Sequence, residues 1–221
     1  MMPLPGIDPV SLLLILLGMA ALPFAAMVVT SYAKIVVVLG LLRNAIGVQQ
    51  VPPNMVLNGI ALIVSCYIMA PIIMDASNAM GLGRPLAGAP TGAQQMLAAV
   101  DTAREPFRRF LDKHAHEREK QFFLRSAELV WPAQQAKLLK KDDLLVLAPS
   151  FLLTEMAAAF RIGFLLYLAF IVVDIVIANV LLAMGLSQVT PTNVAIPFKL
   201  LLFVVLDGWS RLVHGLVLTY K

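Results

Sequence analysis

Four apolar blocks, each long enough to cross a membrane, constrain this chain more than any other feature. No charged residue occurs over residues 10–33 or over residues 44–74. A third block runs from about residue 144 to 185, and a fourth from 194 to 218. About 20 apolar residues suffice for a transmembrane helix. Because 60% of the residues are hydrophobic and only 14% are charged, the sequence predicts an all-α integral membrane protein rather than a soluble domain.

Charge is concentrated in one region of the chain. Residues 75–148 hold 20 of the 30 charged residues, 11 of them Lys or Arg and 9 Asp or Glu. The predicted organisation is therefore two apolar helical hairpins, residues 1–75 and 147–221, separated by a polar insert at 76–146.

The insert is expected to be mostly helical. The pattern from about residue 92 to residue 130 predicts an amphipathic helix, which Trp131-Pro132 ends. Glu105 precedes Arg109 by four residues, the favourable order for a surface ion pair. The predicted apolar stripe comprises Val100, Phe107, Phe110, Leu111, His114 and Phe122.

The fourth block, VAIPFKLLLFVVLDGWSRLVHGLVL, carries three charges: Lys199, Asp207 and Arg211. Each costs roughly 2.5 to 3.5 kcal/mol at the centre of a membrane helix, so the three must face protein, water or one another. Asp174 in the third block is a candidate partner for Lys199 or Arg211. Two interpretations remain open: structural pairing within an assembly, and a proton or ion relay.

No pattern of enzymatic chemistry is present. His114 and His116 are two residues apart, whereas a zinc-binding helix needs two His four apart with Glu directly after the first. Cys66 is a lone cysteine with no metal-ligand companions. The basic residues form no stripe typical of nucleic-acid binding. We therefore predict no catalytic residues, no metal, no cofactor and no nucleic-acid partner.

Three stretches of the chain carry a resemblance to a known family. Residues 30–54 read TSYAKIVVVLGLLRNAIGVQQVPPN, residues 149–185 contain Glu155 and Asp174, and residues 196–209 read IPFKLLLFVVLDGW. They resemble the FliP/YscR/HrcR family, export-apparatus membrane proteins of type III secretion systems and of the flagellum. The ending and the missing signal peptide favour the virulence branch. The motif positions are Asn44, Gln49, Gln50, Pro52, Pro53, Pro197, Gly208 and Trp209.

The resemblance implies a core subunit of an export gate through which unfolded proteins leave the cytoplasm. Members assemble as about five copies with FliQ/SctS-like and FliR/SctT-like partners, and their helices pack in a conical bundle. The intramembrane charges would then lie at helix contacts inside that bundle, where pairing offsets desolvation. These assembly charges are Lys34, Arg43, Glu155, Arg161, Asp174, Lys199 and Asp207.

The turn after the third block is the expected closure of the pore. In flagellar relatives this turn carries consecutive Met residues that form a flexible gasket. The matching positions here are Leu186, Ser187 and Gln188, preceded by Met184, which is a departure from that pattern. Met is soft and deformable, whereas Ser and Gln would wet such a seal.

Location follows from the short first link. Arg43 near it favours the cytoplasmic side for that link, which places the insert in the periplasm of a bacterial inner-membrane protein. The start of the chain lacks a positively charged region, so it is read as retained rather than as a cleaved signal peptide. The alternative function is an ion channel or small-solute transporter subunit that uses Asp174 and Lys199.

Overall fold

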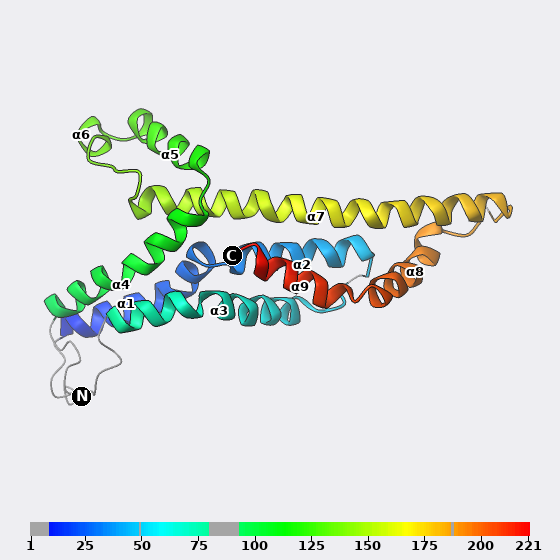
Figure 1. Ribbon diagram of the computed structural model, residues 1–221, viewed down its shortest axis with the longest axis horizontal. Coiled ribbons are helices and arrows are strands. Elements are labelled where there is room, and N and C mark those ends of the chain that lie inside the picture. The colour runs from blue at the N-terminus through cyan, green and yellow to red at the C-terminus, as the bar shows by residue number, and fades with distance from the viewer. Residues whose placement is uncertain (1–8, 49, 80–92, 187) are drawn as a thin grey trace. The chain divides into compact units, whose positions relative to one another are not determined.

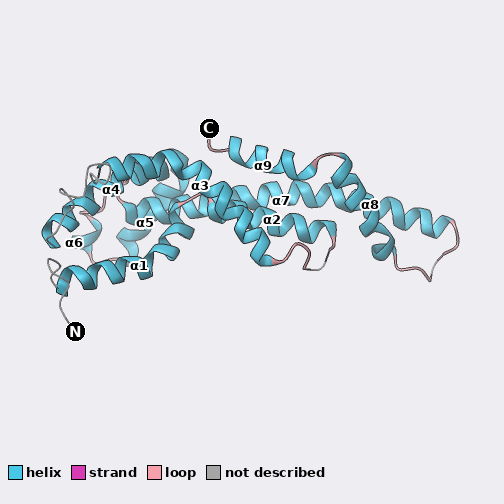
Figure 2. Cartoon of the chain, turned by 90° about the horizontal axis from the view of Figure 1, so that it is seen from below, coloured by secondary structure: helices cyan, strands magenta, loops and turns pink. Residues whose placement is uncertain are grey.

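The structure is a computed structural model that describes residues 9–48, 50–79, 93–186 and 188–221. These residues form helices joined by turns, with no strand among them, so the all-α prediction is confirmed (Figures 1 and 2). The helices are α1 Pro9–Val29, α2 Tyr32–Ile46, α3 Asn54–Ala79, α4 Ala93–His114, α5 Glu117–Val130, α6 Ala133–Ala136, α7 Leu144–Ala183, α8 Pro191–Val205 and α9 Gly208–Leu218.

The chain divides into two compact units. Unit 1 comprises Met1–Ser31 and Met69–Glu155, and unit 2 comprises Tyr32–Ile68 and Met156–Lys221. Helices α3 and α7 each contribute to both units. The boundary between α1 and α2 falls at Thr30–Ser31, so the first apolar block forms two helices rather than one long span.

The core of unit 2 surrounds α2. Its first cluster joins Ile35, Val38 and Leu39 of α2 with Leu57 and Ala61 of α3, Ala159 of α7 and Leu216 of α9. A second cluster comprises Leu42, Ala45, Ile46, Phe170 and Phe203. Figure 1 shows α2 running beside α7 and α9, in agreement with these contacts. The apolar run of α2 is therefore buried by protein within this unit.

One close contact fixes the spacing of α2 and α7. A Cβ atom added at Gly163 would lie 3.0 Å from the Leu41 Cβ atom. Such an approach is shorter than ordinary van der Waals contact, so only glycine lets the two helices meet there. The small residue in α7 therefore positions that helix against α2.

The fourth apolar block is broken. Helices α8 and α9 are bent by 62° at a break that contains Asp207, whose backbone is left-handed with φ 52°. The Phe203 ring contacts Gly208 so closely that a Cβ atom there would clash. The Phe203 and Trp209 rings meet edge to face with their centroids 5.5 Å apart. These contacts of Phe203 join the end of α8 to the start of α9 across the bend.

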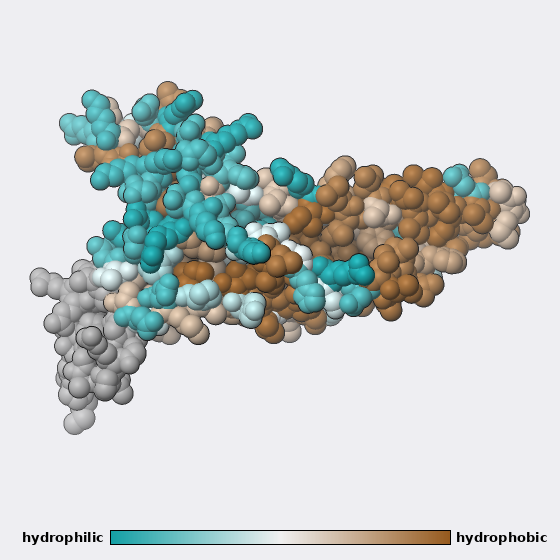
Figure 3. All heavy atoms as spheres, in the orientation of Figure 1, coloured by the Kyte–Doolittle hydropathy of each residue, from teal (hydrophilic) through white to brown (hydrophobic). Residues whose placement is uncertain are grey.

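Membrane-length helices are fewer than the four expected blocks. Among the described residues, α3 and α7 are long and apolar enough to cross a membrane, and the bent α8–α9 pair would make a third span. Helix α7 has 40 residues and a length of about 60 Å, twice the thickness of a typical hydrocarbon core. Hydrophobic side chains cover α8 and the neighbouring end of α7 in Figure 3. The arrangement as two hairpins stays a prediction.

Unit 1 contains the helices of the insert, and here α1 packs against α4. The single helix predicted over residues 92–130 is wrong in one respect, because it is broken between α4 and α5. His116 is extended at the break, and its N–H donates to Thr154 Oγ1 over 3.0 Å. The new start of α5 shifts the apolar phase: Phe110 and Leu111 are buried, but Phe122 is exposed. The side chain of Val100 lies outside the described part of the chain.

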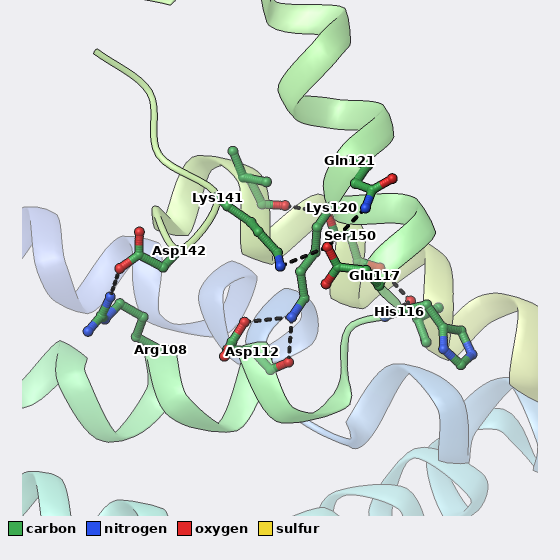
Figure 4. Close-up of polar contacts among 11 residues, drawn as sticks. Arg108, Asp112, His116, Glu117, Lys120, Gln121, Lys141, Asp142 and Ser150 are labelled. Atoms are coloured by element: carbon green, nitrogen blue, oxygen red, sulfur yellow. Dashed lines mark hydrogen bonds and ion pairs between the residues drawn. The ribbon is translucent and has the colours of Figure 1, made fainter. Parts of the chain in front are cut away.

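Ion pairs connect the helices of the insert to one another and to the segment before α7 (Figure 4). Lys120 is buried and donates to the Asp112 carbonyl and carboxylate. Lys141 pairs with Glu117 over 2.7 Å, which lowers the pKa of the Glu117 carboxyl and raises the pKa of the Lys141 ammonium. The segment just before α7 is thereby tied to α5.

Glu105 is paired with a different arginine from the one expected. It binds Arg108, three residues on, through two hydrogen bonds of 2.8 Å, rather than Arg109. The hydrogen bond from Arg108 lowers the pKa of the Glu105 carboxyl, and Glu105 raises the pKa of the Arg108 guanidinium. Arg108 also binds Asp142, so the three-residue spacing connects α4 to the segment before α7.

Candidate functional site

A buried lysine in unit 2 is the most constrained charged group in the apolar part of the chain. The Lys199 Nζ atom donates to Asp174 Oδ2 over 2.6 Å and to the Ala45 carbonyl over 3.2 Å. The Lys199 side chain is 5% exposed and the Asp174 side chain 40% exposed. We call these three groups, from α8, α7 and α2, the lysine junction.

The sequence of α8 explains why this lysine faces inward. Ala195, Lys199 and Phe203 are spaced four residues apart and are all buried. Residues at that spacing share one face of a helix, so Lys199 occupies the middle of the buried stripe of α8. Ala45 lies in the last turn of α2, where carbonyl groups lack a helical N–H partner. The lysine therefore satisfies a helix end and a carboxylate together.

The carboxylate of Asp174 is only half satisfied. Its Oδ2 atom meets Lys199, while its Oδ1 atom is buried and has no hydrogen-bond partner in the described part of the chain. A buried ion pair with a missing hydrogen bond is a weak source of stability but costs several kcal/mol to break. Between the two alternatives left open for Asp174, the structure selects Lys199. Arg211 is exposed.

Lys34 of α2 is buried in the same unit and contacts a residue near the C-terminus. Its Nζ atom lies 3.8 Å from the centroid of the Tyr220 ring, a cation–π contact. This contact ties the C-terminal residues to α2. No sequence pattern predicts this contact, because Lys34 and Tyr220 are far apart along the chain.

The first link, between α2 and α3, is built by motif residues. Gly47 has φ +89°, and its N–H donates to the Arg43 and Asn44 carbonyls at 3.3 and 3.1 Å, which ends α2. Arg43 Nη1 donates to the Pro52 carbonyl at 3.2 Å and to Asn54 Oδ1 at 2.6 Å. Arg43 thus closes the link across both ends.

The remaining motif positions have varied surroundings. The Pro53 carbonyl accepts from Leu57 at the start of α3, while Asn44 and Pro197 are exposed. Gln50 has a left-handed backbone with φ 60°, and Gln49 lies outside the described residues. Their predicted roles stay predictions.

The α7–α8 turn ends α7 with a Schellman motif. Gly185 has φ +73° and donates to the Leu182 carbonyl, and Leu186 donates to the Leu181 carbonyl, both over 3.0 Å. The side chains of Met184, Leu186 and Gln188 are exposed, and Ser187 lies outside the described residues. The turn therefore presents both apolar and polar side chains outward, and its predicted closure of a pore stays a prediction.

Other predicted assembly charges are left uncovered. Arg161 and Asp207 of that set are exposed, as is Arg211 outside it, and none of the three has an ion pair within the described ranges. Asp207 Oδ1 accepts a hydrogen bond from Ser210 Oγ over 3.0 Å. Glu155, by contrast, is buried within unit 1. Among the described residues no cluster of His, Cys, Asp or Glu could hold a metal ion.

Comparison with known proteins identifies the family of this chain. The model of the FliP family matches residues 13–216. The chain belongs to the FliP family. Among its relatives, Pathogenicity-related ORF2 of Xanthomonas campestris pv. glycines is 66% identical over 210 residues, covering 95% of this chain and 96% of the relative.

Two further FliP-family relatives match over almost their full length. The Hypersensitivity response secretion protein HrcR of Ralstonia nicotianae is 64% identical over 216 residues, 98% of this chain and 99% of the relative. The Yop proteins translocation protein R of Yersinia pestis is 44% identical over 213 residues, 96% and 97% of the two chains. The predicted resemblance, including its virulence branch, is confirmed.

Proposed function

We propose that this chain is a core subunit of the type III secretion export gate and forms part of the conduit for unfolded proteins across the bacterial inner membrane. Membership of the FliP family and the secretion and translocation names of its relatives support this. The structural observation that carries the proposal is how little of its apolar surface the chain covers by itself. In the apolar 18-residue stretch of α7 that could cross a membrane, only 6% is buried by the rest of the chain.

Uncovered charges on the same helices strengthen the argument. Arg161, Asp207 and Arg211 are exposed on apolar elements without an ion pair in the described part of the chain. Each would cost roughly 2.5 to 3.5 kcal/mol if it faced lipid at mid-membrane. Neighbouring subunits that supply opposite charges or an aqueous conduit would remove that cost. This chain therefore fits the interior of an assembly better than a lone bundle in lipid.

A groove between α7 and α8 offers a surface for such neighbours. It has a volume of about 720 Å³ and is lined entirely by apolar side chains, among them Val176, Phe198 and Val205. We expect helices of further copies, about five in all, and of FliQ/SctS-like and FliR/SctT-like partners to pack on faces of this kind. The α7–α8 turn, with Met184, Leu186, Ser187 and Gln188, would then narrow the conduit.

The proposed location is the inner membrane, with the polar insert in the periplasm and both hairpin turns toward the cytoplasm. Arg43 at the first link supports this orientation, because basic residues are favoured beside the cytoplasmic face. The proposed function requires no catalytic residue and no cofactor. Energy for transport would come from other components.

The test is native mass spectrometry of the full chain in mild detergent, expressed alone and together with the neighbouring export-apparatus genes. We expect a discrete heteromeric complex with several copies of this chain. Asp207→Asn keeps the left-handed backbone but removes the charge, so it should reduce recovery of the complex while the chain still inserts in the membrane. Glu128→Gln, an exposed acid of α5, is the matched control and should assemble normally.

A self-oligomer that never recruits smaller membrane partners would contradict the export-gate proposal. It would favour the second candidate, an ion channel or transporter subunit, whose supporting observation is the buried, unpartnered Oδ1 atom of Asp174. In that case liposomes with the purified chain should conduct ions, and Asp174→Asn should change the flux. If the heteromeric complex assembles and Asp174→Asn leaves the ion flux of the liposomes unchanged, the channel function is excluded.

A further inference from the structure

The polar insert has an exposed apolar surface at the end of α5. Leu129, Val130 and Leu138 are 88%, 77% and 78% exposed, and Trp131 and Leu145 are exposed beside them. Val130, Trp131 and Leu145 line one pocket of about 200 Å³, so these three side chains form a continuous surface, and Leu129 is the neighbour of Val130 in the sequence, as Leu138 is of the lining residue Leu139. We call these five residues the insert patch. Figure 3 shows hydrophobic side chains over α5 and α6 among hydrophilic ones.

The segment between Leu138 and Leu145, which both belong to the insert patch, is held by ion pairs. Arg108 binds Asp142, and Glu117 binds Lys141 over 2.7 Å, which anchors the segment before α7 to α4 and α5 (Figure 4). The patch is therefore not the surface of a loose loop. The ion pairs hold the backbone between Leu138 and Leu145 in place, which reduces the entropy lost when the patch binds.

The surroundings of the insert patch are positively charged. Arg125, Lys137 and Lys140 are exposed and have no ion pair among the described residues. Of the nearby acids, Asp142 is bound to Arg108 and Asp143 accepts from the Lys140 N–H at 2.6 Å. Glu128 is the exposed acid that remains. An apolar surface with a cationic rim is complementary to a layer that is apolar inside and anionic at its face.

We propose that the insert patch inserts into the headgroup region of a bilayer that contains anionic lipids. Tryptophan beside aliphatic residues is typical of the membrane interface, and exposed Lys and Arg add attraction to anionic headgroups. Leu145 belongs to the first turn of α7, a membrane-length helix, so the patch is covalently tethered close to lipid. The tether makes binding intramolecular, and weak individual contacts then suffice.

The consequence is a second, shallow attachment for the insert, independent of the spanning helices. It would fix the orientation of the insert against the membrane face, whichever subunits pack on α7 and α8. The proposal requires only that the chain is in a membrane, and it stands or falls separately from the export-gate function.

Tryptophan fluorescence provides the test because the chain has two tryptophans, Trp131 and Trp209. The full-length Trp209→Phe variant, which keeps an aromatic ring against Phe203, is reconstituted in nanodiscs of phosphatidylethanolamine and phosphatidylglycerol. Lipids brominated near the headgroup should quench Trp131, and acrylamide should quench it poorly. Trp131→Phe/Trp209→Phe/Lys113→Trp, with its tryptophan at an exposed site of α4 away from the patch, should show the reverse.

Charge dependence identifies the lipid class. Lys137→Gln/Lys140→Gln should shift the ratio of lipid-exposed to water-exposed Trp131 by about fivefold per lysine, with no shift in nanodiscs of phosphatidylcholine alone. If a variant is recovered poorly, Cys66→Ser/Val130→Cys with an environment-sensitive fluorophore gives the same reading with both tryptophans retained. Trp131 that is open to acrylamide and insensitive to brominated lipid would overturn the proposal. Protection that rises with protein concentration without lipid quenching would also overturn it and assign the patch to a second copy.

Discussion

Breaking the lysine junction should destabilise unit 2 more from one side than from the other. Asp174→Asn leaves the Lys199 ammonium, on a side chain only 5% exposed, without a counter-charge, whereas Lys199→Met leaves Asp174, whose side chain is 40% exposed, without its cation. Removing one member of a buried pair costs about 3 to 5 kcal/mol. We expect that full range for Asp174→Asn. Because the Asp174 side chain is less buried than that of Lys199, we expect only about 2 to 3 kcal/mol for Lys199→Met.

The double variant separates pairing from simple loss of packing. In Lys199→Met/Asp174→Asn no buried charge remains, so it should cost less than the sum of the single changes. The coupling should be about 2 to 3 kcal/mol, near the top of the range for residues in direct contact. Part of the cost that remains is the unmet Ala45 carbonyl, worth about 1 kcal/mol or more.

Unfolding by a denaturing detergent in mild-detergent micelles is a suitable assay. In a Trp131→Phe background, Trp209 reports on unit 2, where it packs on Phe203. Lys137→Met, which removes an exposed lysine of the insert, is the control and should stay within about 0.5 kcal/mol of the parent. Single variants that each cost under about 1 kcal/mol and simply add in the double would refute the reasoning.

Three further predictions concern other parts of the fold. Gly163→Ala should cost about 1 to 3 kcal/mol, since its Cβ would press on Leu41, and the same unfolding assay measures it. The hydrogen bond from Lys141 lowers the pKa of Glu117, so this pairing stabilises the insert fully above the usual glutamate pKa, and the stabilisation is lost as the pH falls below that value through the lowered pKa. Trp131 emission should follow that acid transition, which Glu117→Gln should remove. Asp207→Gly should relieve a left-handed backbone by up to about 1 kcal/mol while still impairing assembly.

Each of these has a matched control. Gly40→Ala, in α2, meets nothing within 4 Å and should be neutral or stabilising, so an equal loss at both glycines would show that helix spacing is not the cause. Glu128→Gln should leave the acid transition of the insert in place. An Asp207→Gly chain that is less stable than its parent would show that the bend depends on the aspartate side chain rather than tolerating it.

The apolar blocks and the family could be predicted from the sequence, because both depend on local composition and motif spacing. The start of α7 near residue 144 and the all-α class were predicted for this reason. The break at His116 was missed, because the helical period continues through it. Only the tertiary hydrogen bond from the His116 N–H to Thr154 shows why the chain turns there.

Part of the candidate site could likewise be predicted from the sequence, and part could not. Charges in apolar helices stand out in a sequence, so Lys199 and Asp174 were found, but the choice between Lys199 and Arg211 required the fold. The Ala45 carbonyl carries no sequence signal at all, since any residue supplies a carbonyl. The Lys34–Tyr220 contact joins residues at opposite ends of the chain, and no pattern of spacing could indicate it.

The two classes of charge in unit 2 explain why this chain needs both its own fold and an assembly. Lys34 and Lys199 are buried against groups of the same chain, so their desolvation is offset before any partner arrives. Asp207 and Arg211 lie at and beyond the bend between α8 and α9, and neither has an ion pair in the described ranges. Charges of the first class should therefore govern the stability of the isolated subunit. Charges of the second class should govern recovery of the complex, and a variant of either class that changed both equally would contradict this division.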